Sequence, residues 1–139
     1  MKPEYLPYYE FSKEEGKWSQ QVKTDEVDGQ PYFRWYFIPI LKVPVELLIE
    51  QWEELVNELS DKEVELYNLK EAYLIAESEI VNNTDFKALY GANNQKVRDN
   101  HVKSELADMV GQMKALEFGI GWIRSYIPLL KEVIKEKRQ

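Results

Sequence analysis

The fold of this chain is decided by residues 45–81, which read VELLIEQWEELVNELSDKEVELYNLKEAYLIAESEIV. The stretch contains neither glycine nor proline, and it is rich in Glu and Leu, which both favour the α-helix. Pro44 precedes it directly, at a position where a missing backbone N–H is tolerated because a helix start has no partner for it. The sequence therefore predicts one long helix over residues 44–81.

Apolar residues in this stretch recur with alternating spacings of four and three, the spacing of a coiled-coil seam. A second row with the same spacing lies within residues 96–137, and only Lys62 interrupts the two rows with a polar side chain. The first row is Leu48, Trp52, Leu55, Leu59, Lys62, Leu66, Leu69, Tyr73, Ala76 and Ile80, and the second is Val102, Leu106, Met109, Met113, Leu116, Ile120, Ile123, Ile127, Leu130 and Ile134. Two such rows predict a mainly α fold in which a long antiparallel helical hairpin, of the coiled-coil type, is the main element.

Charge favours the same pairing. Residues 44–81 carry two basic and eleven acidic side chains, whereas residues 82–139 carry ten basic and seven acidic ones. The opposite excess favours pairing of the first helix with the second and disfavours pairing of two first helices. In the connector, residues 82–95, Thr84-Asp85 is a helix-capping pattern and Gly91 a stop signal, so we expect one further helical turn there.

Helix-weakening residues occur in the second helical range. Pro128 has no backbone N–H and clashes with the preceding turn, so we expect a bend near residues 124–128. We expect Gly119 and Gly121 to let another backbone or an aromatic ring pack closely against the helix, and a functional hinge is the alternative.

Residues 1–43 differ in kind, because ten of the eighteen aromatic residues precede Ile38. Lys17–Lys23 and Pro31–Leu41 have strand-like composition, and Asp28-Gly29 between them is a turn signal. The sequence thus predicts a small aromatic-rich β-hairpin at the N-terminal end. An isolated hairpin is marginal in water, so it must pack on the helices or on a partner.

Length, composition and charge limit the class of protein. At 139 residues the chain fits one domain, which we expect to span residues 1–139. The absence of cysteine excludes disulfides, thiolate metal sites and cysteine nucleophiles. The start of the chain lacks an apolar signal segment and no apolar run is long enough to cross a bilayer, so we expect a cytoplasmic protein. The net charge of −7 argues against general affinity for nucleic acid or anionic membranes.

The sequence shows no constellation that would carry catalysis. His101 is the sole histidine, and a metal site or catalytic dyad would need further ligands that converge on it. A di-metal helical bundle would need inward-facing Glu together with Glu-x-x-His, a pattern that this chain lacks. We therefore expect a protein that is not an enzyme and that has no cofactor and no metal.

Two surfaces are candidates for binding a macromolecule. Carboxylates follow one another along the first helix, where they form a solvated face or a contact surface for a basic partner. Aromatic residues of the N-terminal hairpin form its core or contact a partner. The candidate partner-binding residues are Glu50, Glu53, Glu54, Glu58, Asp61, Trp35 and Tyr36.

Lys96, Arg98 and Lys103 form a basic cluster near the start of the second helix, where the helix dipole disfavours cations. They pair with carboxylates of the first helix, or they contact phosphates of a nucleic acid. The second reading predicts a DNA-binding accessory factor of phage recombination or replication.

Two segments resemble parts of small helical-hairpin accessory proteins of phages and prophages of Gram-positive bacteria, together with the long last helix that follows them. The segments are Asp85-Phe86-Lys87-Ala88-Leu89-Tyr90-Gly91 and Asn94-Gln95-Lys96-Val97-Arg98-Asp99. The resemblance covers residues 84–137 and implies a phage accessory gene. Such genes encode helpers of replication and recombination as well as inhibitors of host defence. We therefore expect a non-enzymatic protein that binds a host or phage protein, as an acidic, anti-CRISPR-like inhibitor of a defence or nucleic-acid-binding protein.

Apolar residues outside the two seams leave the oligomeric state open. Ile49, Val56, Val110 and Trp122 are apolar residues that a two-helix seam does not cover. A homodimer in the form of a four-helix bundle would bury them, and so would the aromatic N-terminal region of the same chain.

Overall fold

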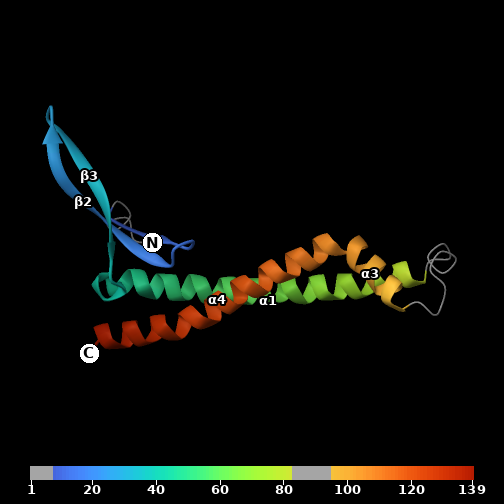
Figure 1. Ribbon diagram of the computed structural model, residues 1–139. Helices are drawn as coiled ribbons and strands as arrows, with labels where there is room; N and C mark the ends of the chain where they lie inside the picture. Colours follow the sequence, from blue (N-terminus) through green and yellow to red (C-terminus); the bar gives the residue numbers. More distant parts are fainter. Residues whose placement is uncertain (1–7, 83–94) are drawn as a thin grey trace. The chain divides into compact units, whose positions relative to one another are not determined.

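The computed structural model describes residues 8–82 and 95–139, and it is mostly helical with a small antiparallel sheet near the start of the chain (Figure 1). The sheet contains β1 (Tyr9–Ser12), β2 (Lys17–Val27) and β3 (Gln30–Ile38), and the 3₁₀ turn η1 (Ile40–Lys42) follows it. The helices are α1 (Val45–Val81), α3 (Gln95–Glu105) and α4 (Ala107–Lys137). The predicted first helix is confirmed, since α1 begins one residue after Pro44 and ends at Val81.

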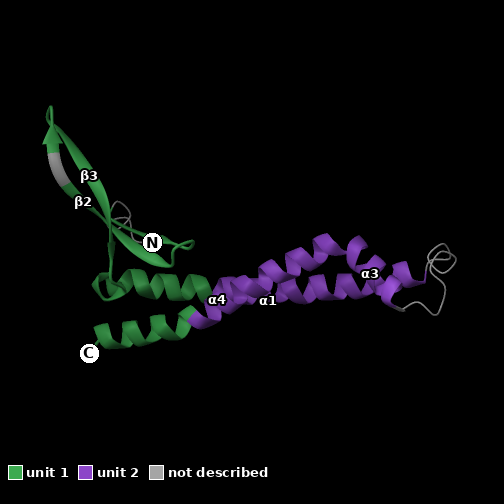
Figure 2. Ribbon diagram, in the orientation of Figure 1, with its two compact units in different colours: residues 1–56, 126–139 green, residues 57–125 purple. Residues whose placement is uncertain are grey.

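The described chain forms two compact units (Figure 2). Unit 1 comprises residues 1–56 and 126–139, and unit 2 comprises residues 57–125. Helices α1 and α4 each contribute to both units, α1 with its first part to unit 1 and α4 with its last part.

The sheet of unit 1 has three strands in the order β1-β2-β3, all antiparallel. The predicted hairpin is present as β2 and β3, and the turn residues Asp28 and Gly29 have φ angles of 53° and 76°, as a two-residue type I′ turn requires. Sequence patterning missed β1, which pairs only with the first residues of β2, from Lys17 to Gln20. Beyond Gln20, β2 and β3 continue as a two-stranded ribbon with one register irregularity after Lys23.

The core of unit 1 lies where the base of the sheet meets the helices. Trp18 of β2 is 3% exposed, and its ring lies 5.4 Å from that of Phe11. The Phe11 ring lies in turn 5.5 Å from the ring of Tyr126 on α4. The rest of this core is aliphatic, each fully buried Leu contributing roughly 1.5–3 kcal/mol: Val43, Leu47, Leu48, Leu55, Leu130 and Val133.

Two polar contacts order the segments of unit 1. Pro44 accepts backbone hydrogen bonds from the amides of Leu47 and Leu48 and so begins α1. The Nζ of Lys137, in the last turn of α4, donates to the backbone carbonyl of Leu41. Tyr126, which precedes Lys137 on α4, bonds to Gln51, which follows Leu41 in the chain, so within unit 1 the first part of α1 and the last part of α4 run in opposite directions.

In unit 2 the buried side chains come from α3, from α4 and from Leu106 between them: Val102, Leu106, Leu116, Ile120 and Ile123. No residue of α1 from 57 to 81 is buried, although its seam residues are all half-buried. The helices are joined across the seam by an ion pair of 2.6 Å between Glu63 and Arg124 and by one of 3.8 Å between Lys70 and Glu117. Both pairs are exposed, so each contributes at most about 1 kcal/mol.

The second helical range differs from the prediction of one helix over residues 96–137. It contains two helices, with Leu106 between α3 and α4. Hydrogen bonds from the Leu106 amide to Val102 and from the Val110 amide to Leu106 span the break, so it is local. Nothing in the structure explains why the break falls at Leu106. The further helical turn expected in the connector lies outside the described residues.

The expectation that Gly119 and Gly121 allow close packing is wrong. A Cβ built on Gly121 meets nothing within 4 Å, and one built on Gly119 meets only the Lys62 side chain, at 3.6 Å. Pro128 lies inside α4, which continues through it to Lys137. The bend expected near Pro128 stays a prediction.

Candidate interaction surfaces

The clearest exposed feature of unit 1 is a row of three aromatic side chains on β3. Directly paired residues of antiparallel strands point to the same face, and successive residues alternate between faces. Phe33, Trp35 and Phe37 therefore share one face, which we call the aromatic row. They are 46%, 45% and 60% exposed.

The aromatic row lies on the face opposite the core of unit 1. Trp18 is paired with Ile38, so both belong to the other face, the one that packs against Phe11 and Tyr126. On β2 the residues paired with the row are Ser19, Gln21 and Lys23, none of which is large and apolar.

Cations flank the aromatic row. The Nζ of Lys17 lies 5.2 Å from the centre of the Phe37 ring, a distance typical of a cation–π contact. Lys23 pairs with Glu26 at 2.6 Å. No described strand pairs with the outer edge of β3, so its outward backbone groups are open to a partner.

Trp35 and Tyr36, both predicted as partner-binding residues, lie on opposite faces of the ribbon. Tyr36 is paired with Gln20 and shares its face with Tyr32 and Arg34. The structure thus does not bring the two predicted residues into one patch. Phe33 and Phe37 were not singled out from the sequence, although the spacing of two between them and Trp35 is the signal that finds them.

The predicted acidic residues are distributed over both units. Glu50, Glu53 and Glu54 belong to unit 1, and Glu58 and Asp61 belong to unit 2. Glu53, Glu54 and Asp61 are exposed, while Glu50 and Glu58 are half-buried. Glu58 lies 3.8 Å from Lys62 on the same helix.

The basic cluster of α3 is only partly brought together. Arg98 and Lys103 line a groove of about 280 Å³ in unit 2, whereas Lys96 is exposed and does not line it. The same groove carries the carboxylates of Glu77 and Asp99. The negative charge of these two carboxylates offsets the positive charge of Arg98 and Lys103. The groove is therefore less suited to binding a phosphate backbone.

Tyr73 lines the same groove and has a perturbed phenol. Desolvation raises the pKa of Tyr73, and the nearby carboxylate of Glu77 raises it further. The phenol is therefore a neutral hydrogen-bonding group at physiological pH and no source of charge.

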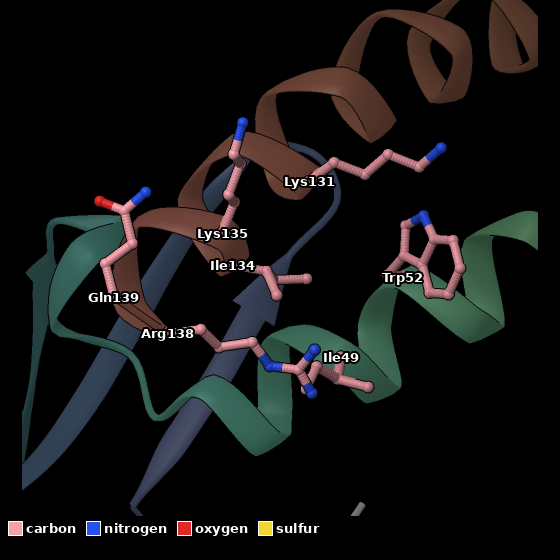
Figure 3. Close-up of a pocket in the computed structure, with 7 residues that line it drawn as sticks. All are labelled: Ile49, Trp52, Lys131, Ile134, Lys135, Arg138 and Gln139. Atoms are coloured by element: carbon pink, nitrogen blue, oxygen red, sulfur yellow. The ribbon is translucent and has the colours of Figure 1, made fainter.

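A second groove lies in unit 1 between α1 and α4 and has a volume of about 530 Å³ (Figure 3). We call it the cationic groove, because Ile49, Trp52 and Ile134 form its apolar part and the side chains of Lys131, Lys135 and Arg138 surround them. The Nζ of Lys131 lies 5.6 Å from the centre of the Trp52 ring. This groove was not predicted from the sequence, although Lys131 and Lys135 on α4 and Arg138 just beyond its end recur at helical spacing.

A buried polar pair lies beside the sheet base. The Tyr126 hydroxyl donates a hydrogen bond of 2.9 Å to Oε1 of Gln51, which is 8% exposed. Burial raises the pKa of Tyr126, and the adjacent side chains of Trp18 and Gln51 partly offset that rise. Neither residue lines the two grooves or belongs to the aromatic row, so we interpret the pair as structural.

Neither a metal centre nor a membrane span is found in the described part of the chain. Over residues 8–82 and 95–139, no group of three or more His, Asp or Glu side chains converges in a way that would hold a metal ion. Among the same residues, no helix combines the length and the apolar character needed to cross a bilayer.

The chain was compared with protein-family models, with curated proteins and with solved structures, and none of them matches it.

Proposed function

We propose that this chain is a non-enzymatic accessory protein that acts by binding another protein, with the aromatic row as the main contact. The observation that carries the proposal is the row itself, three large rings about half-exposed on a strand with an open edge. Exposed apolar patches of this kind mark protein interaction sites, and aromatic residues supply much of the binding energy at such sites. An unpaired strand edge adds backbone hydrogen bonds to such a contact.

The carboxylates of α1 form the second part of the proposed contact. Glu53 and Glu54 are exposed in the same unit as the row, and charges at the rim of an interface steer association. The acidic face fits a basic partner such as a nucleic-acid-binding protein. The proposal is therefore a cytoplasmic, phage-type inhibitor of a host defence or nucleic-acid-binding protein, of the anti-CRISPR kind.

We also propose that α1 and α4 form one continuous antiparallel hairpin. Within unit 1 the hydrogen bond between Gln51 and Tyr126, and within unit 2 the ion pairs between α1 and α4, each fit an antiparallel pair of helices. A single hairpin extends the same pairing over the whole length of α1.

The test is a pull-down from host lysate with tagged protein, with and without nuclease, followed by identification of the retained proteins. We expect one stoichiometric protein that survives nuclease and is lost with Trp35→Ser and with Phe33→Ser. Tyr32→Ser and Tyr36→Ser, on the other face of the same strand, are the matched controls and should retain it. Equal retention by all four variants would reject the aromatic row as the contact.

Charge reversal separates the two parts of the contact. Combined replacement of Glu53, Glu54 and Glu58 by Lys should slow association and reduce the dependence of binding on salt.

The alternative function, a DNA-binding accessory factor, predicts retention of nucleic acid alone. That retention would be lost when Lys96, Arg98 and Lys103 are replaced by Glu.

A further inference from the structure

We infer that the cationic groove of unit 1 binds a small amphipathic organic anion, a carboxylate or phosphate carried on an apolar body. This site is distinct from the aromatic row and goes beyond the proposed protein-binding function. Its volume of about 530 Å³ lies in the range of small-molecule sites.

The apolar part of the groove selects the body of the ligand. Ile49 and Trp52 come from α1 and Ile134 comes from α4, so both helices contribute to the floor (Figure 3). An inorganic anion would leave these side chains in contact with water. A ligand with an apolar body removes that surface from water, at about 25 cal/mol per Å².

The polar groups of the groove are nearly all donors. The described residues provide no ion-pair partner for Lys131, Lys135 or Arg138. The indole Nε1 of Trp52 is buried and has no hydrogen-bond acceptor. Among the lining side chains only Gln139 offers an acceptor oxygen, so the groove presents mainly cations to an incoming ligand.

The position of the cations suits an anion that lies along α4. Lys131 and Arg138 are seven residues apart, which is two turns or about 10 Å along a helix. Figure 3 shows Lys131 extending toward the side of Trp52 and Arg138 extending toward Ile49, whereas Lys135 points away from α1. Lys131 and Arg138 therefore bracket the apolar floor, and Lys135 belongs to the rim.

The helix C-terminus accounts for only part of this charge. Cations in the last turn are stabilised by the free carbonyls at the end of a helix, and Lys135 and Lys137 lie in the last turn of α4. Lys131 lies well before the last turn of α4, which ends at Lys137. The helix end therefore does not explain Lys131.

The test uses titration calorimetry of the whole chain with three probes. Octanoate combines an apolar chain with a carboxylate, 1-octanol lacks the charge, and inorganic phosphate lacks the apolar body. We expect octanoate to bind more tightly than either of the others, with an affinity that falls as salt is raised. Octanol binding as tightly as octanoate would overturn the inference, because the cations would then have no role.

Single substitutions locate the site. Lys131→Gln and Arg138→Gln should each weaken octanoate binding about fivefold or more, as expected for loss of a charge-assisted contact. Lys114→Gln is the matched control, because it removes an exposed lysine of α4 outside the groove.

Two results would contradict the inference. One is an octanoate affinity that is the same in the wild type, Lys131→Gln and Arg138→Gln. The other is binding of a peptide of alternating Glu and Leu without any binding of octanoate, which would make the groove a protein-docking surface. Trp35→Ser, which tests the aromatic row, should leave octanoate binding unchanged, so the two proposals fail or hold separately.

Discussion

Lys62 is the polar residue that interrupts the seam of α1, and the structure shows what accommodates it. Its Cδ, Cε and Nζ atoms lie 3.6 Å from the position that a Cβ on Gly119 would take. That separation is an ordinary van der Waals contact, so an alanine at position 119 would also fit beside the aliphatic stem of Lys62, while the charged end lies 3.8 Å from Glu58. Lys62 is accommodated at a seam position because its stem packs beside Gly119 and its amine reaches a carboxylate on its own helix.

Gln51 and Tyr126 form a buried side-chain hydrogen bond with each other. Tyr126→Phe removes the donor to Gln51 Oε1 and leaves that buried oxygen without a partner. We expect a loss of about 1–3 kcal/mol in the free energy of unfolding, measured by urea denaturation. The double variant Gln51→Leu with Tyr126→Phe should recover part of the loss. Equal stability of Tyr126→Phe and the wild type would show that the hydrogen bond contributes nothing.

The phenol of Tyr126 also predicts a dependence of stability on alkaline pH. Its pKa in the folded protein is raised above the ordinary value of 10.0, chiefly by burial. The folded state therefore holds a proton that the unfolded state loses above pH 10, so this contribution is complete below that pH and is lost as the pH rises through the folded pKa. Unfolding midpoints measured from pH 8 to 11 should fall less in Tyr126→Phe than in the wild type. Parallel curves for the two proteins would exclude the effect.

At the scale of elements, helix α4 contains glycines that lower its stability and that no neighbouring atom requires. Gly111 and Gly121 lie inside it, and a Cβ on either would meet nothing within 4 Å. Their cost is one of backbone entropy, since an unfolded glycine has more conformations to lose.

Gly121→Ala is therefore expected to stabilise the protein by about 0.5–1 kcal/mol, and Gly111→Ala by a similar amount. Urea denaturation with an unchanged slope measures the gain. Gly29→Ala is the contrasting control, because its φ of 76° is strained for an alanine and the substitution should destabilise the ribbon turn. A loss of stability in Gly121→Ala would indicate that the position is needed for a conformation other than the one described.

Helix α1 shows how far an element depends on what packs against it. Its buried residues are Leu47, Leu48, Gln51 and Leu55, and all of them belong to unit 1. In that unit the base of the sheet and α4 both contribute to the core. In unit 2 the seam residues of α1 are only half-buried. A pair of helices has no third layer to exclude water from the sides of the seam.

At the scale of the whole molecule, a continuous hairpin predicts a fixed distance between the units. Lys114 is three residues from Glu117, which pairs with Lys70, and Lys70 is seventeen residues beyond Glu53 on α1. In an antiparallel pair Lys114 then lies about twenty residues along α1 from Glu53, so at 1.5 Å per residue spin labels at Glu53→Cys and Lys114→Cys should lie about 30 Å apart. Pulsed electron resonance should give one narrow distribution. A broad distribution would show that the units move independently, and the pair Glu53→Cys with Glu65→Cys on α1 serves as the reference.

Only those features of the candidate surfaces that depend on the spacing of nearby residues could be predicted from the sequence. Trp35 was selected because the N-terminal region is rich in aromatic residues, but its neighbours Phe33 and Phe37 depend on the strand period of two. The separation of Trp35 from Tyr36 follows from the same period. The cationic groove was missed because Trp52 and Lys131 are far apart in sequence and meet only when α1 and α4 pack.

The sequence by itself determined the elements whose signal is local. A run of 37 residues without glycine or proline predicts α1, and Asp28-Gly29 predicts the ribbon turn, because backbone preferences act over a few neighbouring residues. Tertiary structure alone decided which apolar residues are covered. The base of the sheet is buried through Trp18, while the aromatic row on its other face is left exposed, since burial depends on which segments distant in sequence come into contact.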